Sequence, residues 1–161
     1  RQACSELLKD PTPFANVLQL TQCARDALQH CGMQRVLLLL TDRQHTRLQA
    51  QQSHGLSAEA GKLVLDPQQS QVLRRLLSQP GQLRLSPDNM AQFSALLPGS
   101  LKSLFISQHL ILRSVANQGH VAMLLVVDQH GAPFNETQLQ AFGKTVQCIE
   151  RALGSFARRG R

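Results

Sequence analysis

The feature that most constrains the fold of this chain is an unbroken apolar run from Val121 to Val127. These seven residues are too few to cross a membrane as a helix, which needs about 20. The short length and the three valines favour a β-strand over a buried helix. Because both faces are apolar, we expect a central strand that is covered on both sides. Alternation along the strand predicts one face with Val121, Met123, Leu125 and Val127, and another with Ala122, Leu124 and Val126.

The segments on either side of this run predict a hairpin and a long helix. Residues 109–116 form a second β-like run, and residues 117–119 (Asn-Gln-Gly) form the predicted turn between the two strands. Downstream, Asn135 is the expected N-cap of the last helix, and Gln138 is its capping-box partner. The same helix carries a stripe of apolar residues. The stripe fits a helix that lies on its own sheet, and the alternative is a coiled coil. Its members are Leu139, Phe142, Val146, Ile149, Leu153 and Phe156.

The remaining helices and strands follow from local signals. A capping side chain stands directly before a proline at Thr12-Pro13, Asp66-Pro67 and Ser86-Pro87, and each pair predicts the start of a helix. The first of these helices is expected to end at Gly32, after a short helical lead-in of residues 1–11. Strands are predicted at residues 34–42, 46–52, 62–65 and 82–85, with the polar segment 46–52 at a sheet edge.

Composition and charge indicate a globular domain with an aliphatic core. Hydrophobic residues make up 42% of the chain, which has six Phe, no Trp and no Tyr. The net charge of +7 is concentrated at the ends, because residues 2–157 carry thirteen Lys and Arg against ten Asp and Glu. No basic stripe interleaves with stacking aromatic residues, so we expect no nucleic-acid partner. We find no transmembrane run and no secretory signal, so we also expect no membrane partner.

The cysteines and histidines show no metal-binding or catalytic pattern. Cys4, Cys23, Cys31 and Cys148 form no CxxC pair and no zinc-ligand spacing, and all four fall in predicted helices. HExxH, GxSxG, P-loop and dinucleotide-binding glycine motifs are absent from the sequence. We therefore expect no metal, no catalytic residue and no enzymatic activity. Buried thiols fit a reducing, cytoplasmic setting. Because the chain begins at Arg1 rather than Met, we expect it to be a piece of a longer protein.

Two polar residues are candidates for a ligand pocket. His109 and Arg113 are four residues apart on a predicted strand and therefore share one face, where they alternate with Ile111. Polar groups on a central hairpin can line a pocket, and the guanidinium fork of Arg113 would hold an anionic or polar ligand. The alternative is a solvated pair at the sheet surface.

Much of the chain resembles a GAF domain. The resemblance rests on residues 93–104 (FSALLPGSLKSL), on residues 119–128 (GHVAMLLVVD), and on residues 133–136 (PFNE) followed by Leu139 and Phe142. The first predicted helix and the strand from Val36 to Asp42 resemble the opening of that domain. The resemblance assigns residues 12–157 to a GAF-like domain, after the lead-in 1–11 and before a basic tail 158–161.

The resemblance implies an α+β fold with a central antiparallel sheet of five or six strands. The first and last helices would cover one face, and short helices and loops of residues 53–105 would close a cleft on the other. GAF domains are sensory or regulatory modules that bind small molecules such as cyclic nucleotides, haem or bilins, and many dimerise. Bacterial examples can follow an HDOD domain, which would be an upstream partner in the same chain.

The function that this resemblance implies is a non-catalytic regulatory module of a bacterial cytoplasmic signalling protein. Such a module would sense a small molecule or mediate dimerisation. A ligand-free dimerisation scaffold is the alternative, and a GAF-type enzyme is a remote one.

Departures from family patterns leave the cofactor unknown. Of the Asn-Lys…Phe…Asp-Glu signature of cyclic-nucleotide-binding GAF domains, only Phe134 is present, so we expect no micromolar binding of cyclic AMP or cyclic GMP. The pocket cysteine that attaches bilins has no counterpart, and neither do the loop cysteines of the methionine sulfoxide reductase branch. Met123 stands where the family often has glycine, and we expect it to fill part of the cleft.

Two sets of candidate residues result. The ligand-pocket candidates are His54, Phe93, Phe105, His109, Arg113 and Met123. A cleft filled by Met123 and Phe105 would favour a scaffold, and a polar cavity around His109 and Arg113 would favour a sensor. A homodimer is expected along the first and last helices, where small residues would let a second copy approach closely. The dimer-interface candidates are Ala24, Ala27, Ala141, Thr145, Cys148 and Ala152.

Overall fold

The computed structural model describes residues 17–159. Its strands form one six-stranded sheet in the order β3-β2-β1-β6-β5-β4, and all neighbouring strands are antiparallel. In chain order the elements are α2 (Val17–His30), β1 (Arg35–Thr41), β2 (Leu48–His54), η1 (Ala58–Lys62), β3 (Val64–Leu65), η2 (Pro67–Gln69), α3 (Gln71–Ser78), β4 (Gln82–Leu85), α4 (Pro87–Phe93), η3 (Ser94–Leu96), α5 (Gly99–Phe105), β5 (Leu110–Asn117), β6 (His120–Asp128) and α6 (Glu136–Arg159).

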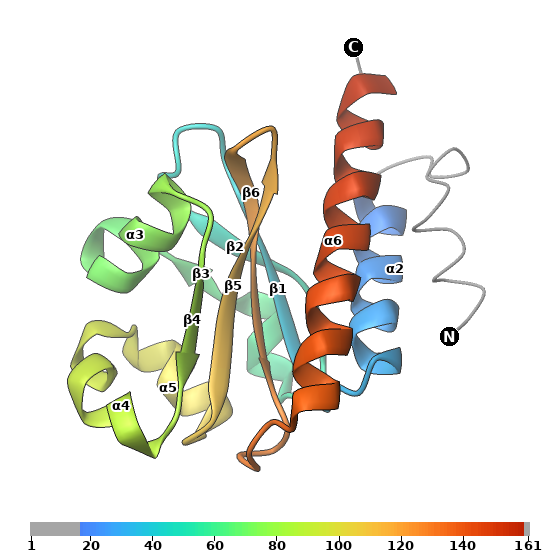
Figure 1. Cartoon of the computed structure of the whole chain (residues 1–161). Coiled ribbons are helices and arrows are strands. Elements are labelled where there is room, and N and C mark those ends of the chain that lie inside the picture. Colours follow the sequence, from blue (N-terminus) through green and yellow to red (C-terminus); the bar gives the residue numbers. More distant parts are fainter. Residues whose placement is uncertain (1–16, 160–161) are drawn as a thin grey trace.

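The sheet is covered on both faces, as Figure 1 shows. The long helices α2 and α6 lie together on one face and form what we call the two-helix layer. The short helices α3, α4 and α5 lie on the other face and form the short-helix layer. This architecture confirms the predicted fold class.

The apolar run 121–127 lies within β6, between β1 and β5, at the centre of the sheet. Met123, Leu125 and Val127 pack in one buried cluster with residues of α2 and α6. The predicted face was wrong for Val121, which packs in the other cluster, beside Leu124. The physical reason is an irregularity in the β5–β6 pairing, where Met123 pairs with Val115 but Val121 pairs with Ala116. The extra residue in β6 turns Val121 to the opposite face.

The hairpin turn is tighter than predicted. Asn117 still belongs to β5, and the turn itself consists of Gln118 and Gly119. Both residues have positive φ, at 56° and 80°, which is the pattern of a type I′ hairpin turn. This turn matches the right-handed twist of the strands that it joins.

The predicted capping box starts α6. The Asn135 side chain accepts a hydrogen bond from the Gln138 backbone N–H at 2.8 Å, and the Gln138 side chain accepts one from the Asn135 N–H at 2.9 Å. Behind this cap, Phe142, Val146 and Ile149 are buried in the cluster that α2 and the sheet share with α6. The apolar stripe of α6 therefore covers its own sheet, as expected.

Other elements differ in detail. Asp66-Pro67 opens only the 3₁₀ turn η2, and the α-helix that follows begins after Ser70, whose side chain caps it. Residues 99–105, which the sequence analysis did not assign, form α5. The segment predicted as an edge strand pairs with β1 on one side and with the two-residue β3 on the other. The predicted helix start at Thr12-Pro13 and the lead-in 1–11 lie outside the described residues. No helix of residues 17–159 combines the length and apolar character that crossing a membrane requires.

Candidate ligand-binding cleft

The centre of the short-helix layer is filled by side chains. Leu37 and Leu39 of β1 and Leu124 and Val126 of β6 are all fully buried there. They pack against residues of α3 and α5, among them Leu73, Leu101 and Phe105. Clefts open at the margin of this layer, where the short helices meet β4 and β5.

The first cleft, which we call the α3–β4 cleft, has a volume of about 290 Å³. Its polar groups are Gln71 and Arg75 of α3 and Gln82 of β4. Mainly apolar walls with a few polar groups are typical of small-molecule sites. The apolar lining consists of Val72, Leu76, Leu83, Phe93 and Leu96.

Local sequence signals hold the two walls of the α3–β4 cleft together. The Ser70 hydroxyl caps α3 by accepting a hydrogen bond from the Leu73 N–H at 3.2 Å. The same hydroxyl donates to the carbonyl oxygen of Leu96 in η3 at 2.7 Å. Ser70 is 3% exposed, so this contact is shielded from water. One buried serine therefore fixes the start of α3 against the segment that carries Phe93 and Leu96.

The polar lining has unused hydrogen-bonding capacity. The Arg75 side chain is exposed and makes no hydrogen bond or ion pair with any described residue. The Gln82 side-chain oxygen accepts a hydrogen bond from Arg113 Nη1 at 2.8 Å. This contact orients the Gln82 amide and leaves its NH₂ group as a donor. The Gln82 side chain thus lies on the same face as Arg113, and Gln71 and Arg75 are the donors on the α3 side of the cleft.

A second cleft, the α4–α5 cleft, has a volume of about 270 Å³ and includes Phe105 and Ile106. Ile106 is 84% exposed and has φ 45°, a left-handed conformation that is strained for a β-branched side chain. It ends α5, and its N–H donates to the Lys102 carbonyl. The other lining residues are Met90, Ser94, Leu97, Lys102, Ser107, Gln108 and Leu110.

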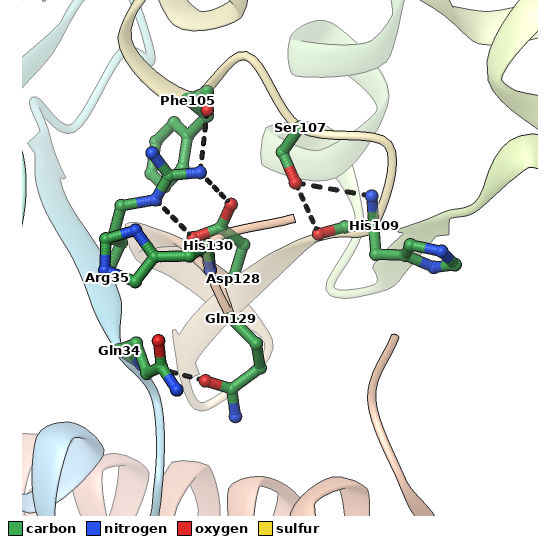
Figure 2. Close-up of polar contacts among 8 residues, drawn as sticks. All are labelled: Gln34, Arg35, Phe105, Ser107, His109, Asp128, Gln129 and His130. Carbon is green, nitrogen blue, oxygen red and sulfur yellow. Dashed lines mark hydrogen bonds and ion pairs between the residues drawn. The ribbon is translucent and has the colours of Figure 1, made fainter. Parts of the chain in front are cut away.

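A buried ion pair anchors α5 to the sheet, as Figure 2 shows. Arg35 of β1 donates from Nε to Asp128 Oδ1 at 2.8 Å and from Nη2 to Oδ2 at 2.5 Å. Nη2 also donates to the carbonyl oxygen of Phe105, at the end of α5, at 2.7 Å. The guanidinium carbon lies 5.6 Å from the centre of the Phe105 ring. The hydrogen bonds that Arg35 donates to the Asp128 carboxylate raise the pKa of Arg35, which stays charged.

The neighbouring polar side chains form hydrogen bonds with backbone N–H groups. Asp128 Oδ1 also accepts from the His130 N–H at 3.3 Å, and Gln129 Oε1 accepts from the Gln34 N–H at 3.1 Å. Figure 2 shows that these residues surround the Arg35–Asp128 pair at one end of the sheet. The Nε2 of Gln129 is buried without a hydrogen-bond partner in the described part of the chain. This cluster joins β1, β6 and α5, and its role is structural.

The structure separates the six pocket candidates. Phe93 lines the α3–β4 cleft, whereas Phe105 lines the α4–α5 cleft. Met123 is buried in the two-helix layer, on the opposite face of the sheet, so the expectation that it fills a cleft beside Phe105 was wrong.

The polar candidates do not form a cavity with these residues. Arg113 alternates with Leu112 and Ser114, which face the short helices, and its guanidinium reaches Gln82 at the sheet edge. His109 precedes β5, and neither it nor Arg113 lines the two clefts described above. His54 pairs with Val36, which packs in the two-helix layer. His109 and Arg113 were predicted to share one face of the strand. That face turns away from the short helices, so the two residues do not form a polar cavity there.

Half of the dimer-interface candidates belong to the core of a single chain. Ala24, Ala27 and Ala152 are 0%, 4% and 0% exposed and pack in the two-helix layer. Small side chains there let α2 and α6 lie closely on the sheet and on each other, so these residues cannot meet a second copy. The prediction was therefore wrong for these three residues. The other three candidates are half-buried: Ala141, Thr145 and Cys148.

The three cysteines that the structure describes are half-buried. Cys23 and Cys148 lie in helices, but Cys31 follows the last residue of α2, which corrects its predicted helical placement. Burial raises the pKa of the Cys31 thiol, against the opposite effect of a hydrogen bond with Thr145. A raised pKa disfavours the thiolate that attack and metal binding require. Within residues 17–159, no three His, Cys, Asp or Glu side chains are placed to hold a metal ion.

Gln71, Arg75 and Gln82 line the cleft but were not among the residues predicted from the sequence. The apolar residues of α3 indicated which side of the helix is buried. Gln71 and Arg75 are four residues apart, so the sequence could have placed both at the margin of that side. The contact of α3 with β4 and Phe93 depends on tertiary packing, and no local signal indicated it.

No protein-family model matches the sequence, and no curated protein matches it either. Solved structures do match. A segment of a methyl-accepting chemotaxis protein superposes with a TM-score of 0.75 at 16% identity, over 94% of this chain and 94% of that one. The GAF domain/HD domain protein from Geobacter sulfurreducens has a TM-score of 0.67 at 16% identity, over 96% and 97%. The free methionine-R-sulfoxide reductase from Neisseria meningitidis has a TM-score of 0.65 at 16% identity, over 99% and 89%.

Several other matched structures are GAF domains, one of them bound to phycoerythrobilin. Their superposition covers 99% of this chain. The chain therefore has the GAF-domain fold, as the sequence resemblance implied. At these identities the similarity establishes the fold alone.

Proposed function

We propose that this chain is a regulatory module of a signalling protein and that it responds to a small molecule bound in the α3–β4 cleft. The observation that carries the proposal is the Arg75 guanidinium, which has no partner among residues 17–159 and lies beside an otherwise mainly apolar lining. The matched chemotaxis protein and the GAF/HD protein support a role in signalling. The resemblance further supports a bacterial cytoplasmic protein with an HDOD domain upstream.

The dimensions of the cleft define the ligand class. At about 290 Å³ the cleft is at the lower end of the range of small-molecule sites, roughly 300–1,000 Å³. A single-ring or short aliphatic molecule fits this size, whereas a haem or bilin is several times larger. Arg75 would pair with a carboxylate, and the Gln71 and Gln82 amides would bind further polar atoms. We therefore propose a small carboxylate with an apolar body, and we maintain that cyclic nucleotides do not bind.

The proposed role is non-catalytic. The fold does not decide this point, because the matched Neisseria protein is a reductase. The support comes from the half-buried cysteines and from the raised pKa of Cys31, which disfavours a reactive thiolate.

A thermal-shift screen of small aromatic and aliphatic carboxylates tests the ligand site. Each hit is measured with the parent chain, Arg75→Ala and Gln82→Ala, and with Arg84→Ala as matched control. Arg84 is an exposed arginine of β4 that does not line the cleft. We expect Arg75→Ala to weaken binding by about tenfold or more, because it loses a charge-assisted hydrogen bond, and Gln82→Ala to weaken binding by a smaller factor. Equal responses of all four proteins would contradict the proposal.

A ligand-free dimerisation scaffold is the second candidate, and the filled centre of the short-helix layer favours it. In this case no small molecule would stabilise the chain, and light scattering would find a dimer. A stable interface should bury more than about 1,000 Å². Ala141→Arg, at a half-buried position of α6, would then produce a monomer, whereas Gln140→Arg at an exposed position would have a weaker effect. A parent chain that remains monomeric at high micromolar concentration would exclude this candidate.

A further inference from the structure

A separate groove lies between α3 and the turn that joins β1 to β2. We call it the α3–turn groove, and its volume is about 520 Å³. It shares Gln71 and Arg75 with the α3–β4 cleft, but Arg74 and His45 line only the groove. The remaining lining residues are Pro67, Gln68, Leu77 and Ser78. Most of these side chains are hydrogen-bonding or cationic, which distinguishes the groove from the more apolar cleft.

The positive charge of the groove is not neutralised. Neither Arg74 nor Arg75 forms an ion pair or side-chain hydrogen bond with a described residue, and both are exposed. The lining contains no carboxylate. Asp42, in the adjacent turn, accepts hydrogen bonds from the Thr46 hydroxyl and backbone N–H. Asp66 accepts from the Gln68 N–H at 2.9 Å. Both neighbouring carboxylates therefore accept hydrogen bonds within their own turns and do not pair with the two guanidinium groups.

One wall of the groove is held in place. His45 has φ 56°, and its Nε2 lies 2.9 Å from the Val121 carbonyl oxygen, to which it donates. Its ring stacks on His120 with ring centres 4.7 Å apart and planes at 21°. A fixed ring opposite α3 reduces the ordering that a ligand would have to impose on the site. The arginines, on a helix that begins with a side-chain cap, provide the facing wall.

We propose that the α3–turn groove binds a small organic phosphate that carries two or more phosphate groups. Two neighbouring guanidinium forks match the geometry of phosphate oxygens, which each fork can bind through two parallel hydrogen bonds. The Gln68 and Gln71 side chains supply neutral donors around them. Pro67 and Leu77, which are both buried, form the apolar floor of the groove. This site shares Arg75 with the α3–β4 cleft, but it needs no ligand in that cleft.

Calorimetry with the whole chain at low salt tests the site, with inorganic tripolyphosphate and a nucleoside triphosphate as probes. The variant is Arg74→Gln, since Arg74 does not line the α3–β4 cleft, and the matched control is Arg84→Gln. Circular dichroism establishes that both variants are folded. We expect Arg74→Gln to weaken the binding of either probe by about tenfold or more, and Arg84→Gln to change it by less than about twofold. Binding should also weaken as salt rises, because the site is open to solvent.

Three outcomes would overturn the proposal. The first is no binding of either probe at millimolar concentration. The second is an equal loss in both arginine variants, which would indicate a diffuse positive field. The third is a polyglutamate peptide that binds more tightly than both probes with the same dependence on Arg74, which would assign the groove to an acidic protein segment. Gln82→Ala should leave phosphate binding unchanged, which separates this result from failure of the proposed carboxylate site.

Discussion

The two faces of the sheet are covered in different ways. The two-helix layer consists of continuous helices of 14 and 24 residues, whereas α3 has 8 residues and α4 and α5 have 7 each. One long amphipathic helix covers its face with a single apolar stripe. The short helices need a separate cap or turn at each junction, and the α3–β4 and α4–α5 clefts open at these junctions. The long helices therefore need few caps to cover their face, and these two clefts lie where the short helices are interrupted.

The largest expected effect comes from a charge placed inside the two-helix layer. Ala152→Glu puts a carboxylate at a fully buried position with no partner, so we expect it to lower the free energy of unfolding by about 5 kcal/mol or more. Gln147→Glu, at an exposed position of the same helix, should change it by less than about 0.5 kcal/mol. Circular dichroism during urea unfolding measures both. A folded, monomeric Ala152→Glu chain would show that this position is not in the core.

The second effect concerns the ion pair that joins β1 and β6 to the short-helix layer. Arg35→Met leaves the Asp128 carboxylate, whose side chain is 0% exposed, without its partner. We expect a loss of about 3–5 kcal/mol in the free energy of unfolding, and the double variant Arg35→Met/Asp128→Leu should recover most of it. Equilibrium unfolding of the three proteins tests this. If the single variant is as stable as the parent, the pair does not anchor α5.

The third effect compares the polar contacts that tie β5 to each layer. Ser114 donates to the Leu76 carbonyl of α3 at 2.5 Å, and Glu150 of α6 accepts from the Ala116 N–H at 2.9 Å. The Leu76 carbonyl has no helical partner, because the residue four positions later is Pro80, which lacks an N–H.

Ser114→Ala therefore leaves the buried Leu76 carbonyl oxygen without a hydrogen-bond donor and should lower the free energy of unfolding by about 1–3 kcal/mol. Glu150→Ala should have a smaller effect of about 1 kcal/mol, because the half-buried Ala116 N–H can donate a hydrogen bond to water instead. Ser103→Ala, at an exposed serine of α5, is the control. Unfolding midpoints in urea rank the three variants. A larger loss for Glu150→Ala would reverse the comparison.

The smallest effect is a pH dependence at the edge of the two-helix layer. Burial raises the pKa of the Cys31 thiol above its unfolded value of about 8.5. Its contribution to stability is then fully present below that unfolded value and is lost as pH rises through the folded one. We expect the stability difference between the parent and Cys31→Val to shrink in this alkaline window. Alkylation of Cys31, followed by mass spectrometry across the same range, should lag behind that in the unfolded chain. Equal rates in the folded and unfolded chains would show that the thiol is not shielded.

The sequence by itself determined the elements whose causes are local. The unbroken apolar run predicted a central strand, and its turn follows from the positive φ that Gly119 allows. The α6 cap needs only Asn135 and Gln138, three residues apart, and the stripe behind it repeats at the helical period. These features depend on neighbours within a few residues, so the local pattern is sufficient to predict them.

The tertiary structure decided everything that depends on distant contacts. A single irregularity in the β5–β6 pairing put Val121 on the opposite face from Met123, and periodicity alone cannot locate such a shift. The partners Arg35 and Asp128 are 93 positions apart. The candidate site likewise combines α3 with β4 and Phe93, and the small residues of the long helices meet within one chain. These outcomes were not predictable, because packing between elements selects among faces that the local pattern leaves equivalent.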